Sequence, residues 1–321
     1  MPPPTFYNII SHDTVHIAIP RKSHFSLGTS PYYAHQHGLA LDIYQQIGLD
    51  NYRALSPVEG RVLTIKKMRA RKGKYRIKGG IEEEYLLLIE NRENPEIVYK
   101  ILHIKPIVRE REIVEIGDPL GTTLRNGYFA YWSSPHLHLE VRASTDAVRA
   151  RGGKFLNLNL TEDRAPLDAP PNPKELSSIP VLIEKIYPEF ILGRFPDYFY
   201  CSIDWIKGVR GTHKGQECIL DGGFPLYQHG VSILPHKTVR PLQQPICLGN
   251  SKIGVLQGVQ EHLGFVDFNA VKCMLDGHEL RGISLFLSKF TPYVKFIPRK
   301  MNALAFQENS THHLTIQKFR T

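Results

Sequence analysis

The sequence has few cysteines and no long apolar run, and both absences narrow the class of protein. Its 321 residues include four cysteines, all in the second half and without a Cys-x-x-Cys pair: Cys201, Cys218, Cys247 and Cys273. Such spacing predicts neither a zinc knuckle nor a dense disulfide framework. Because no segment reaches about 18 consecutive apolar residues, no membrane span is predicted.

Sequence signals for export and for two common hydrolase classes are missing as well. The first 22 residues lack the basic start and unbroken apolar run of a secretory signal peptide, since Ser11, His12, Asp13 and His16 interrupt them. We therefore expect a cytoplasmic protein. The chain also has no phosphate-binding loop of the Gly-x4-Gly-Lys-Ser/Thr type and no nucleophile elbow.

The composition is that of a folded protein with a basic surface. Hydrophobic residues make up 42% and aromatic residues 10%, which is enough to build ordinary cores. Lys and Arg number 40 against 31 Asp and Glu, a net charge of +9. Composition alone identifies no anionic partner, so a solvated surface is the preferred interpretation and nucleic-acid binding is not predicted.

A proline-rich stretch divides the chain. Residues 166–180 carry five prolines among Asp, Asn and Ser: Pro166, Pro170, Pro171, Pro173 and Pro180. Such a run favours an extended linker over packed structure. We expect one domain over residues 1–165 and a second over 181–321, in line with the usual size of about 100–150 residues per domain.

Both halves have the pattern of a mainly β protein. Short runs rich in Val, Ile, Leu and Tyr alternate with Gly, Pro and Asn, and no convincing helix stands out. The predicted strands of the first half are Val15–Ile19, Leu39–Tyr44, Arg61–Ile65, Tyr85–Ile89, Ile97–Ile104 and Leu137–Val141. We expect an antiparallel sheet or flattened barrel there.

The second half shows further strand-like runs and no internal repeat. The predicted strands are Tyr198–Ile203, Glu217–Leu220, Gly230–Leu234, Ile253–Leu256 and Ser284–Leu287, with a turn at Asp221-Gly222-Gly223. Its seven histidines form no His-x-His or His-x3-His spacing, so structural or surface roles are expected for them.

Chemistry first appears in the segment from Ser133 to Arg142. A strand alternates its faces with period two, so His136, His138, Glu140 and Arg142 would share one face. The apolar residues between them would share the buried face, which leaves the polar face on a cleft. Two imidazoles on one face are candidates for a metal site or an acid/base pair.

A second cluster supplies the missing ligands. His35 and His37 precede Gly38, and Asp42 follows within the apolar segment Leu39–Ile43. A carboxylate in such a segment is costly unless a cation or hydrogen bonds compensate it. Zinc would provide that compensation.

Taken together, these blocks resemble the signature of the lysostaphin-type zinc metallopeptidases. The match consists of His37-x4-Asp42 and the block from Pro135 to Arg142. Between them, Ser56–Val62 resembles the family's first core hairpin and Val114–Gly121 the turn before its last strands. The resemblance covers roughly residues 30–145, with the blocks in the family's order.

The resemblance implies a β-sheet groove that holds one Zn²⁺ ion and a peptide or peptide-containing polymer as substrate. Carried over by position, His37, Asp42 and His138 would be the ligands, leaving a fourth position for water. His136 and His103 match the family's catalytic histidines, which would deprotonate the water or stabilise the oxyanion.

Two departures from the family pattern concern His37 and His103. The family has three residues between its first ligand and the aspartate, whereas His37 and Asp42 enclose four. This separation puts the pair on opposite faces of a regular strand, so a bulge or turn at Gly38 must redirect His37. His35 is the alternative ligand. Near His103, Ile101 replaces the family's aromatic residue.

Two other functions are weighed against peptide hydrolysis. One is a non-catalytic zinc-binding or scaffold module with the same fold. The other is a binder of anionic polymers built on the basic stretch 66–78, which is followed by Glu82, Glu83 and Glu84. A solvated hairpin whose acidic and basic arms face each other explains that stretch more simply.

Overall fold

The structure is a computed structural model that describes residues 5–49, 52–75, 80–160, 178–236, 243–268 and 271–318. Within them the chain is mainly β, as the sequence predicts. The helical segments described are α1 (Tyr33–Gln36) and the 3-10 turns Ser144–Asp146 and Asp197–Phe199. In this described part, no helix has the length and apolarity that a membrane crossing requires.

The chain forms two compact units. Unit 1 comprises Met1–Phe25 and Tyr33–Asn159, and unit 2 comprises Ser26–Tyr32 and Leu160–Thr321. Of the linker predicted over 166–180, residues 166–177 lie outside the described residues, and Ile179 and Pro180 begin strand β13. The short segment 26–32 therefore belongs to the second unit although the chain around it belongs to the first.

Unit 1 is built from antiparallel strands. Their bounds are β1 (Phe6–His12), β2 (Val15–Pro20), β3 (His24–Ser26, whose last residue belongs to unit 2), β4 (Ala40–Tyr44), β5 (Arg53–Leu55), β6 (Gly60–Arg69), β7 (Glu83–Asn91), β8 (Ile97–Leu102), β9 (Ile104–Pro106), β10 (Ile113–Val114), β11 (Pro119–Thr123) and β12 (Leu137–Ala143). All six strands predicted for this half lie within or overlap these elements.

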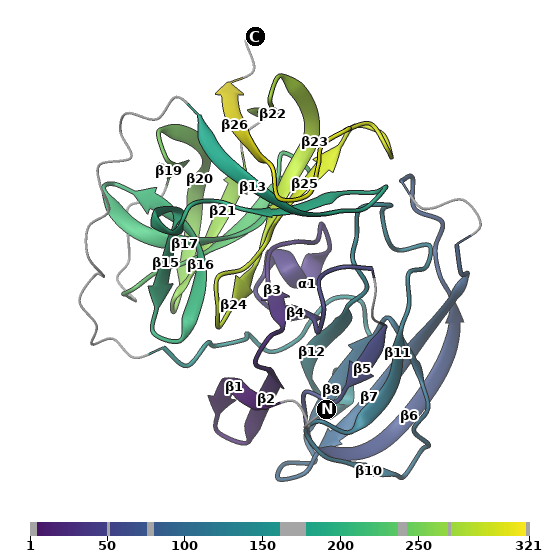
Figure 1. Cartoon of the computed structure of the whole chain (residues 1–321). Coiled ribbons are helices and arrows are strands. Elements are labelled where there is room, and N and C mark those ends of the chain that lie inside the picture. Colours follow the sequence, from purple (N-terminus) through teal and green to yellow (C-terminus); the bar gives the residue numbers. More distant parts are fainter. Residues whose placement is uncertain are drawn as a thin grey trace. The chain divides into compact units, whose positions relative to one another are not determined.

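The main sheet of unit 1 brings β4, β8 and β12 side by side. Strand pairing runs in the order β4–β12–β8–β7–β6–β10, visible as a curved sheet in Figure 1. Its register sets Asp42 directly opposite His138, and His138 opposite Leu102 on the other side. Two segments that lie about 95 residues apart in sequence therefore meet at one place in the sheet.

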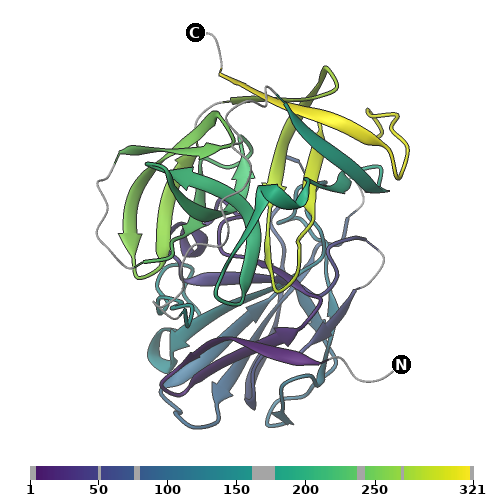
Figure 2. The same cartoon turned by 60° about the vertical axis from the view of Figure 1, so that its left-hand side comes forward.

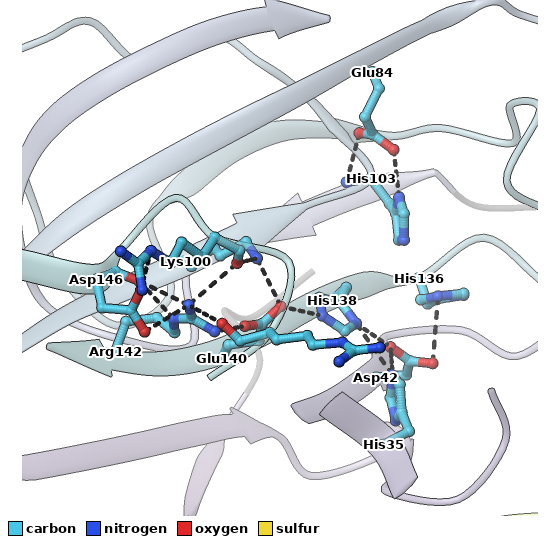
Figure 3. Close-up of polar contacts among 12 residues, drawn as sticks. His35, Asp42, Glu84, Lys100, His103, His136, His138, Glu140, Arg142 and Asp146 are labelled. Carbon is cyan, nitrogen blue, oxygen red and sulfur yellow. Dashed lines mark hydrogen bonds and ion pairs between the residues drawn. The ribbon is translucent and has the colours of Figure 1, made fainter. Parts of the chain in front are cut away.

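Strand β12 is buried on both faces, whereas the sequence predicts one polar face on a cleft. Leu137, Leu139 and Val141 form the apolar face, and the residues between them are also buried. Figure 3 shows His138, Glu140 and Arg142 following one another along the other face. The predicted alternation is confirmed, but its polar side is covered, because these charged groups satisfy one another.

The basic stretch joins the sheet as one arm of a hairpin. Strands β6 and β7 pair so that Arg69 lies opposite Glu83. Lys67 forms an ion pair with Glu83, and Glu82 accepts from Arg69 at 2.8 Å and lies 3.3 Å from the Lys72 amine. The predicted pairing of acidic and basic arms is confirmed. Residues 76–79 of the stretch lie outside the described residues.

Unit 2 contains the remaining strands, in two groups. The first consists of β13 (Ile179–Ile186), β14 (Ile191–Arg194), β22 (Val271–Leu275), β23 (His278–Leu285), β25 (Val294–Pro298) and β26 (Thr311–Lys318). The second consists of β16 (Ile206–His213), β17 (Gln216–Phe224), β18 (His229–Ile233), β19 (Gln244–Leu248), β20 (Ser251–Gln260) and β21 (Leu263–Phe268). The short strands β15 (Tyr200–Ile203) and β24 (Leu287–Ser288) complete the unit.

The pairings close each group into a six-stranded ring. One ring runs β16–β17–β18–β21–β20–β19 and back to β16. The other runs β22–β23–β25–β14–β13–β26 and back to β22. If the strands of the first ring are numbered along the chain from β16, their order around the ring is 1-2-3-6-5-4. The second ring has the same order when numbering starts at β22 and continues from β26 to β13, which is a circular permutation. Figure 2 shows the curved strands of both.

The turn predicted at Asp221-Gly222-Gly223 is wrong, because all three residues lie inside β17. The glycines serve a close approach instead. Gly222 has φ of 135°, and a Cβ there would lie 3.0 Å from both Gly230 Cα and the Phe268 ring. The Asp221 carboxylate accepts hydrogen bonds from the backbone N–H groups of Leu27 and Gly28, at 2.7 and 3.0 Å.

The four cysteines all lie in the described part of unit 2 and remain thiols. Burial raises the pKa of Cys201 and of Cys273 to about 12. Thiols held this far from ionisation are unreactive packing groups.

Candidate metal centre

The centre begins with Asp42 and His138, which face each other across neighbouring strands. Asp42 lies at the middle of β4 and His138 near the start of β12, and the register makes them direct partners. His138 Nδ1 lies 2.9 Å from Asp42 Oδ1. Both side chains are buried, so the carboxylate depends on the surrounding histidines for compensation.

His35 completes a triangle of donor atoms. Its Nε2 lies 3.2 Å from His138 Nδ1 and 3.3 Å from Asp42 Oδ1. Together with the 2.9 Å edge between His138 and Asp42, the three atoms form a compact group that could hold a metal ion. Figure 3 shows the three side chains converging from α1, β4 and β12.

A single helical turn directs His35 into this group. Helix α1 ends in two hydrogen bonds, from Gly38 N to His35 O at 3.4 Å and from Leu39 N to Ala34 O at 2.8 Å. With φ of 65° at Gly38, this is the Schellman arrangement that stops a helix at glycine. His35 therefore lies on a helix. The rule that residues an odd number apart point to opposite faces of a strand does not apply to His35 and Asp42.

His37, the sequence-preferred ligand, lies outside the cluster. Its ring is exposed and stacks on Tyr33 with 4.0 Å between centroids, and its Nδ1–H donates to the Tyr33 carbonyl at 2.9 Å. Gly38 does redirect the chain, as the sequence suggests, but the residue that it turns inward is His35. The alternative predicted ligand, His35, therefore lies in the cluster, and the preferred one, His37, does not.

The second nitrogen of His138 faces another buried carboxylate. His138 Nε2 lies 3.1 Å from Glu140 Oε1, so both ring nitrogens meet carboxylate oxygens. Burial alone would lower the pKa of His138, but hydrogen bonds to Asp42 and Glu140 raise it to about 9. The two carboxylates therefore stabilise a positive charge at His138. A second proton on the ring or a cation at Nδ1 can supply that charge.

Glu140 is held by two buried cations. Lys100 Nζ donates to Oε1 and Arg142 Nη1 to Oε2, each at 2.9 Å. Arg142 is fully buried and also donates to the carbonyls of Asp146, Arg149 and Arg151. Burial alone would raise the pKa of Glu140, but His138 and Lys100 lower it to about 2. The carboxylate behind His138 is thus a permanently charged acceptor.

His136 lies beside Asp42 in a different environment. Its Nδ1–H donates to the Ser134 carbonyl at 2.9 Å, which leaves Nε2 as the acceptor, 3.5 Å from Asp42 Oδ2. Aromatic rings of Phe129 and Tyr44 lie at centroid distances of 4.8 and 4.9 Å. Burial lowers the pKa of His136 to about 4 despite the nearby Asp42, so the ring is neutral near pH 7.

His103 also reaches the cluster, because the strand predicted over Ile97–Ile104 breaks there. The break separates β8 from β9, and His103 has φ of 67°, an uncommon conformation for a residue other than glycine. Its ring centroid lies 5.4 Å from that of His136 and 5.7 Å from that of His138. The structure therefore brings His103, His136, His138 and Asp42 together with His35.

The donor set fits zinc. A tetrahedral ion with bonds of about 2.0 Å needs ligand atoms about 3.3 Å apart, and the three edges here measure 3.2, 3.3 and 2.9 Å. Two imidazoles and one carboxylate are a common catalytic zinc set. With an ion at Nδ1, the hydrogen bond from His138 Nε2–H to Glu140 would fix the tautomer of His138.

Sequence reasoning missed the residues that surround the centre. The sequence predicts Glu84 in the acidic arm of a solvated hairpin, yet it is buried and bound to His103. Lys100 lies in an apolar strand opposite Glu140, a register that only the fold reveals. An isolated charge within Ile97–Leu102 was the one signal available for it, by the same reasoning that singled out Asp42.

Comparisons with known proteins give two matches. A family model described as the N-terminal domain of a domain of unknown function, DUF8155, matches residues 14–158, the part that contains the whole centre. No curated protein matches the chain. Among solved structures, the NMR solution structure of lysostaphin is 14% identical, with 92% of this chain and 96% of that chain covered at a TM-score of 0.25. A TM-score this low does not establish a shared whole-chain fold.

Proposed function

We propose that unit 1 is a zinc-dependent peptidase whose ligands are His35, Asp42 and His138. The observation that carries the proposal is the position of His138 between two buried carboxylates, with a third donor, His35 Nε2, 3.2 Å from its Nδ1. A divalent cation in the triangle would satisfy all of these groups at once. The order of the sequence blocks that resemble lysostaphin-type peptidases supports the same conclusion.

The two remaining histidines provide what hydrolysis needs besides a metal. When bound, zinc would supply an activated water near neutral pH. His136 is neutral, and its Nε2 acceptor faces the Asp42 side of the centre, so it would take the proton of that water and return it to the leaving amine. His103 approaches from the other side, and its Nε2, left as an acceptor by the Nδ1 bond to Glu84, would orient the same water.

The proposed substrate is a peptide or a peptide-containing polymer. The resemblance to lysostaphin-type peptidases implies that the scissile bond is an amide, and His136 would take up and return the proton that its cleavage requires. Zinc would be the one cofactor.

A zinc-holding scaffold is the second candidate, and burial favours it. The His35 and Asp42 side chains are 1% and 2% exposed, as in a structural site that substrate does not enter. A structural site, however, has no use for His136 and His103, whose rings lie against each other beside the ligands. The two functions therefore differ in what the loss of His136 does.

The test combines zinc content with turnover on a broad peptide library for the wild type, His136→Ala and His37→Ala. A peptidase predicts that His136→Ala keeps its zinc but loses about 10²–10⁴-fold in turnover. His37→Ala, which removes an exposed imidazole, should keep both. Zinc in every protein with turnover in none would favour the scaffold. Turnover unchanged in His136→Ala would refute the assigned role.

A further inference from the structure

Glu84 is a buried carboxylate whose oxygens are fully used. It lies near the start of β7, and its side chain is 1% exposed. Oε1 accepts from the backbone N–H groups of Tyr85 and His103, at 2.8 and 2.9 Å. Oε2 accepts from the His103 ring at 2.5 Å and from Asn126 Nδ2 at 2.9 Å. One carboxylate thus binds both the backbone and the ring of the same histidine.

This double contact fixes the His103 side chain at both ends. The backbone contact supports the uncommon φ of 67°, which turns the residue out of the line of β8. The ring contact involves Nδ1, and an ionised carboxylate can only accept a hydrogen bond. Nδ1 must therefore carry a proton, and in the neutral ring Nε2 is then the acceptor.

The geometry sends Nε2 towards the centre. Figure 3 shows Glu84 at one end of the His103 ring and His136 and His138 beyond the other end. The ring also packs against Phe129, with 4.8 Å between the ring centroids and 67° between the ring planes. Rotation of the ring would break the bond to Glu84 and leave Oε2 of this buried carboxylate with the Asn126 amide as its remaining donor.

If Glu84 served only to shape the backbone, fewer hydrogen bonds would be needed. Bonds from the backbone N–H groups of Tyr85 and His103 to Oε1 would suffice to shape the turn between β8 and β9. Oε2 and Asn126 add a clamp on the ring itself. Burial alone would raise the pKa of Glu84, but the charge and hydrogen bond of His103 lower it to about 2, so the carboxylate is ionised throughout the neutral range.

We propose that Glu84 is a positioning residue that holds the His103 ring with its proton on Nδ1 and its Nε2 towards the metal centre. The inference rests on the proposed function for its purpose, because an oriented Nε2 acceptor would hold the water that the metal activates. The orientation and the proton position themselves are properties of the metal-free protein. They can therefore be tested whether or not the protein cleaves peptides.

The first experiment measures the tautomer of His103 directly. Two-bond ¹H–¹⁵N correlation spectra of the metal-free, ¹⁵N-labelled full chain at neutral pH identify which ring nitrogen carries the proton, with His103→Gln used to assign the signals. We expect Nδ1 of His103 to be protonated. A neutral His103 protonated on Nε2 in the wild type would overturn the proposal without any further variant.

The second experiment compares Glu84→Gln with the wild type. The amide keeps the shape but removes the obligatory acceptor, so His103 should shift to a mixture of tautomers while His136, bound to Ser134 O, keeps its own pattern. Turnover should fall about 10- to 100-fold in kcat with KM and zinc per chain unchanged.

Two results would decide against Glu84. An unchanged His103 spectrum in folded Glu84→Gln would contradict positioning, and so would equal losses for Glu84→Gln and for Glu84→Asp, the variant that retains the charge and should recover part of the activity. A wild type without peptidase turnover would remove the proposed function, while the spectra would still decide the role of Glu84.

Discussion

Histidines pair with carboxylates in both units, and burial makes the difference between them. In unit 1, His138 lies between Asp42 and Glu140, with all three side chains less than a tenth exposed. In unit 2, His312 Nδ1 lies 2.6 Å from Asp276 Oδ2 and its Nε2 lies 2.7 Å from Ser310 Oγ, but the Asp276 side chain is 41% exposed. Similar distances thus occur in two different dielectric environments.

Short contacts alone do not make a chemical centre. Water screens the Asp276–His312 pair, so little free energy depends on it. The buried pair in unit 1 has no such screening, and each charge there requires a partner. For this reason the centre in unit 1 is surrounded by a second layer of charged residues, Lys100, Arg142 and Glu84. Loss of one member should leave its buried partners without a compensating charge.

The largest expected effect follows from removing the fully buried guanidinium. Arg142→Met should lower the free energy of unfolding by about 3–5 kcal/mol, because Glu140 and three carbonyls lose a buried partner. Arg149→Ala is the matched control, since Arg149 contacts the same Asp146 while its side chain is 83% exposed. Urea denaturation should find less than about 1 kcal/mol for the control. Equal losses in both variants would contradict the role given to burial.

The second effect is an acid dependence that comes from Glu84. Its pKa in the folded protein is about 2, below its ordinary value of 4.5, so its stabilisation is present above pH 4.5 and is lost as pH falls towards 2. The full contribution is about 3 kcal/mol. Urea denaturation of the metal-free protein at decreasing pH should give a steeper loss for the wild type than for Glu84→Gln. If the free energy of unfolding fell equally with pH in both proteins, Glu84 would not contribute to the acid dependence of stability.

A smaller effect is expected behind the metal ligand. Glu140→Gln should weaken zinc binding by about 10- to 100-fold, because the neutral amide is a poorer acceptor for His138 Nε2–H. Competition with a chelator of known affinity measures this change. The comparable change in the other unit, Asp276→Asn, should leave zinc affinity unaltered. Equal affinities for wild type and Glu140→Gln would remove Glu140 from the account.

The smallest effect concerns the exposed pair. His312→Ala should change the free energy of unfolding by less than about 1 kcal/mol, since the partner carboxylate is largely in water. Thermal or urea denaturation of unit 2 provides the measurement. A loss as large as that of Arg142→Met would mean that distance, and not burial, sets the strength of these pairs.

Much of the fold was predictable because strands leave a local pattern. Alternating and apolar runs located β4, β7, β8 and β12. The absence of helical periodicity agrees with the described helices, which are three or four residues long. Closure of the two rings in unit 2 was not predictable, since pairs such as β13–β26 join residues far apart in the sequence. Gly222 and Gly223 misled because glycine serves close approach as well as turns.

The candidate centre was partly predictable for a similar reason. Period-two spacing placed His136 and His138 on one face, and an isolated charge in an apolar run marked Asp42. The choice between His35 and His37 depended on one turn of helix and a left-handed Gly38, which change the direction of a side chain without a clear sequence signal. Glu84 was hidden because it follows two partly exposed charges of the same type, Glu82 and Glu83.

The most direct test of the central claim is zinc per chain in His35→Ala and His37→Ala, each purified and reloaded in parallel with the wild type. Both variants remove one imidazole from the same short segment, two residues apart, but only His35 lies in the donor triangle. We predict about one zinc ion per chain for the wild type and for His37→Ala, and a near-complete loss for His35→Ala. Zinc retained in His35→Ala and lost in His37→Ala would contradict the account.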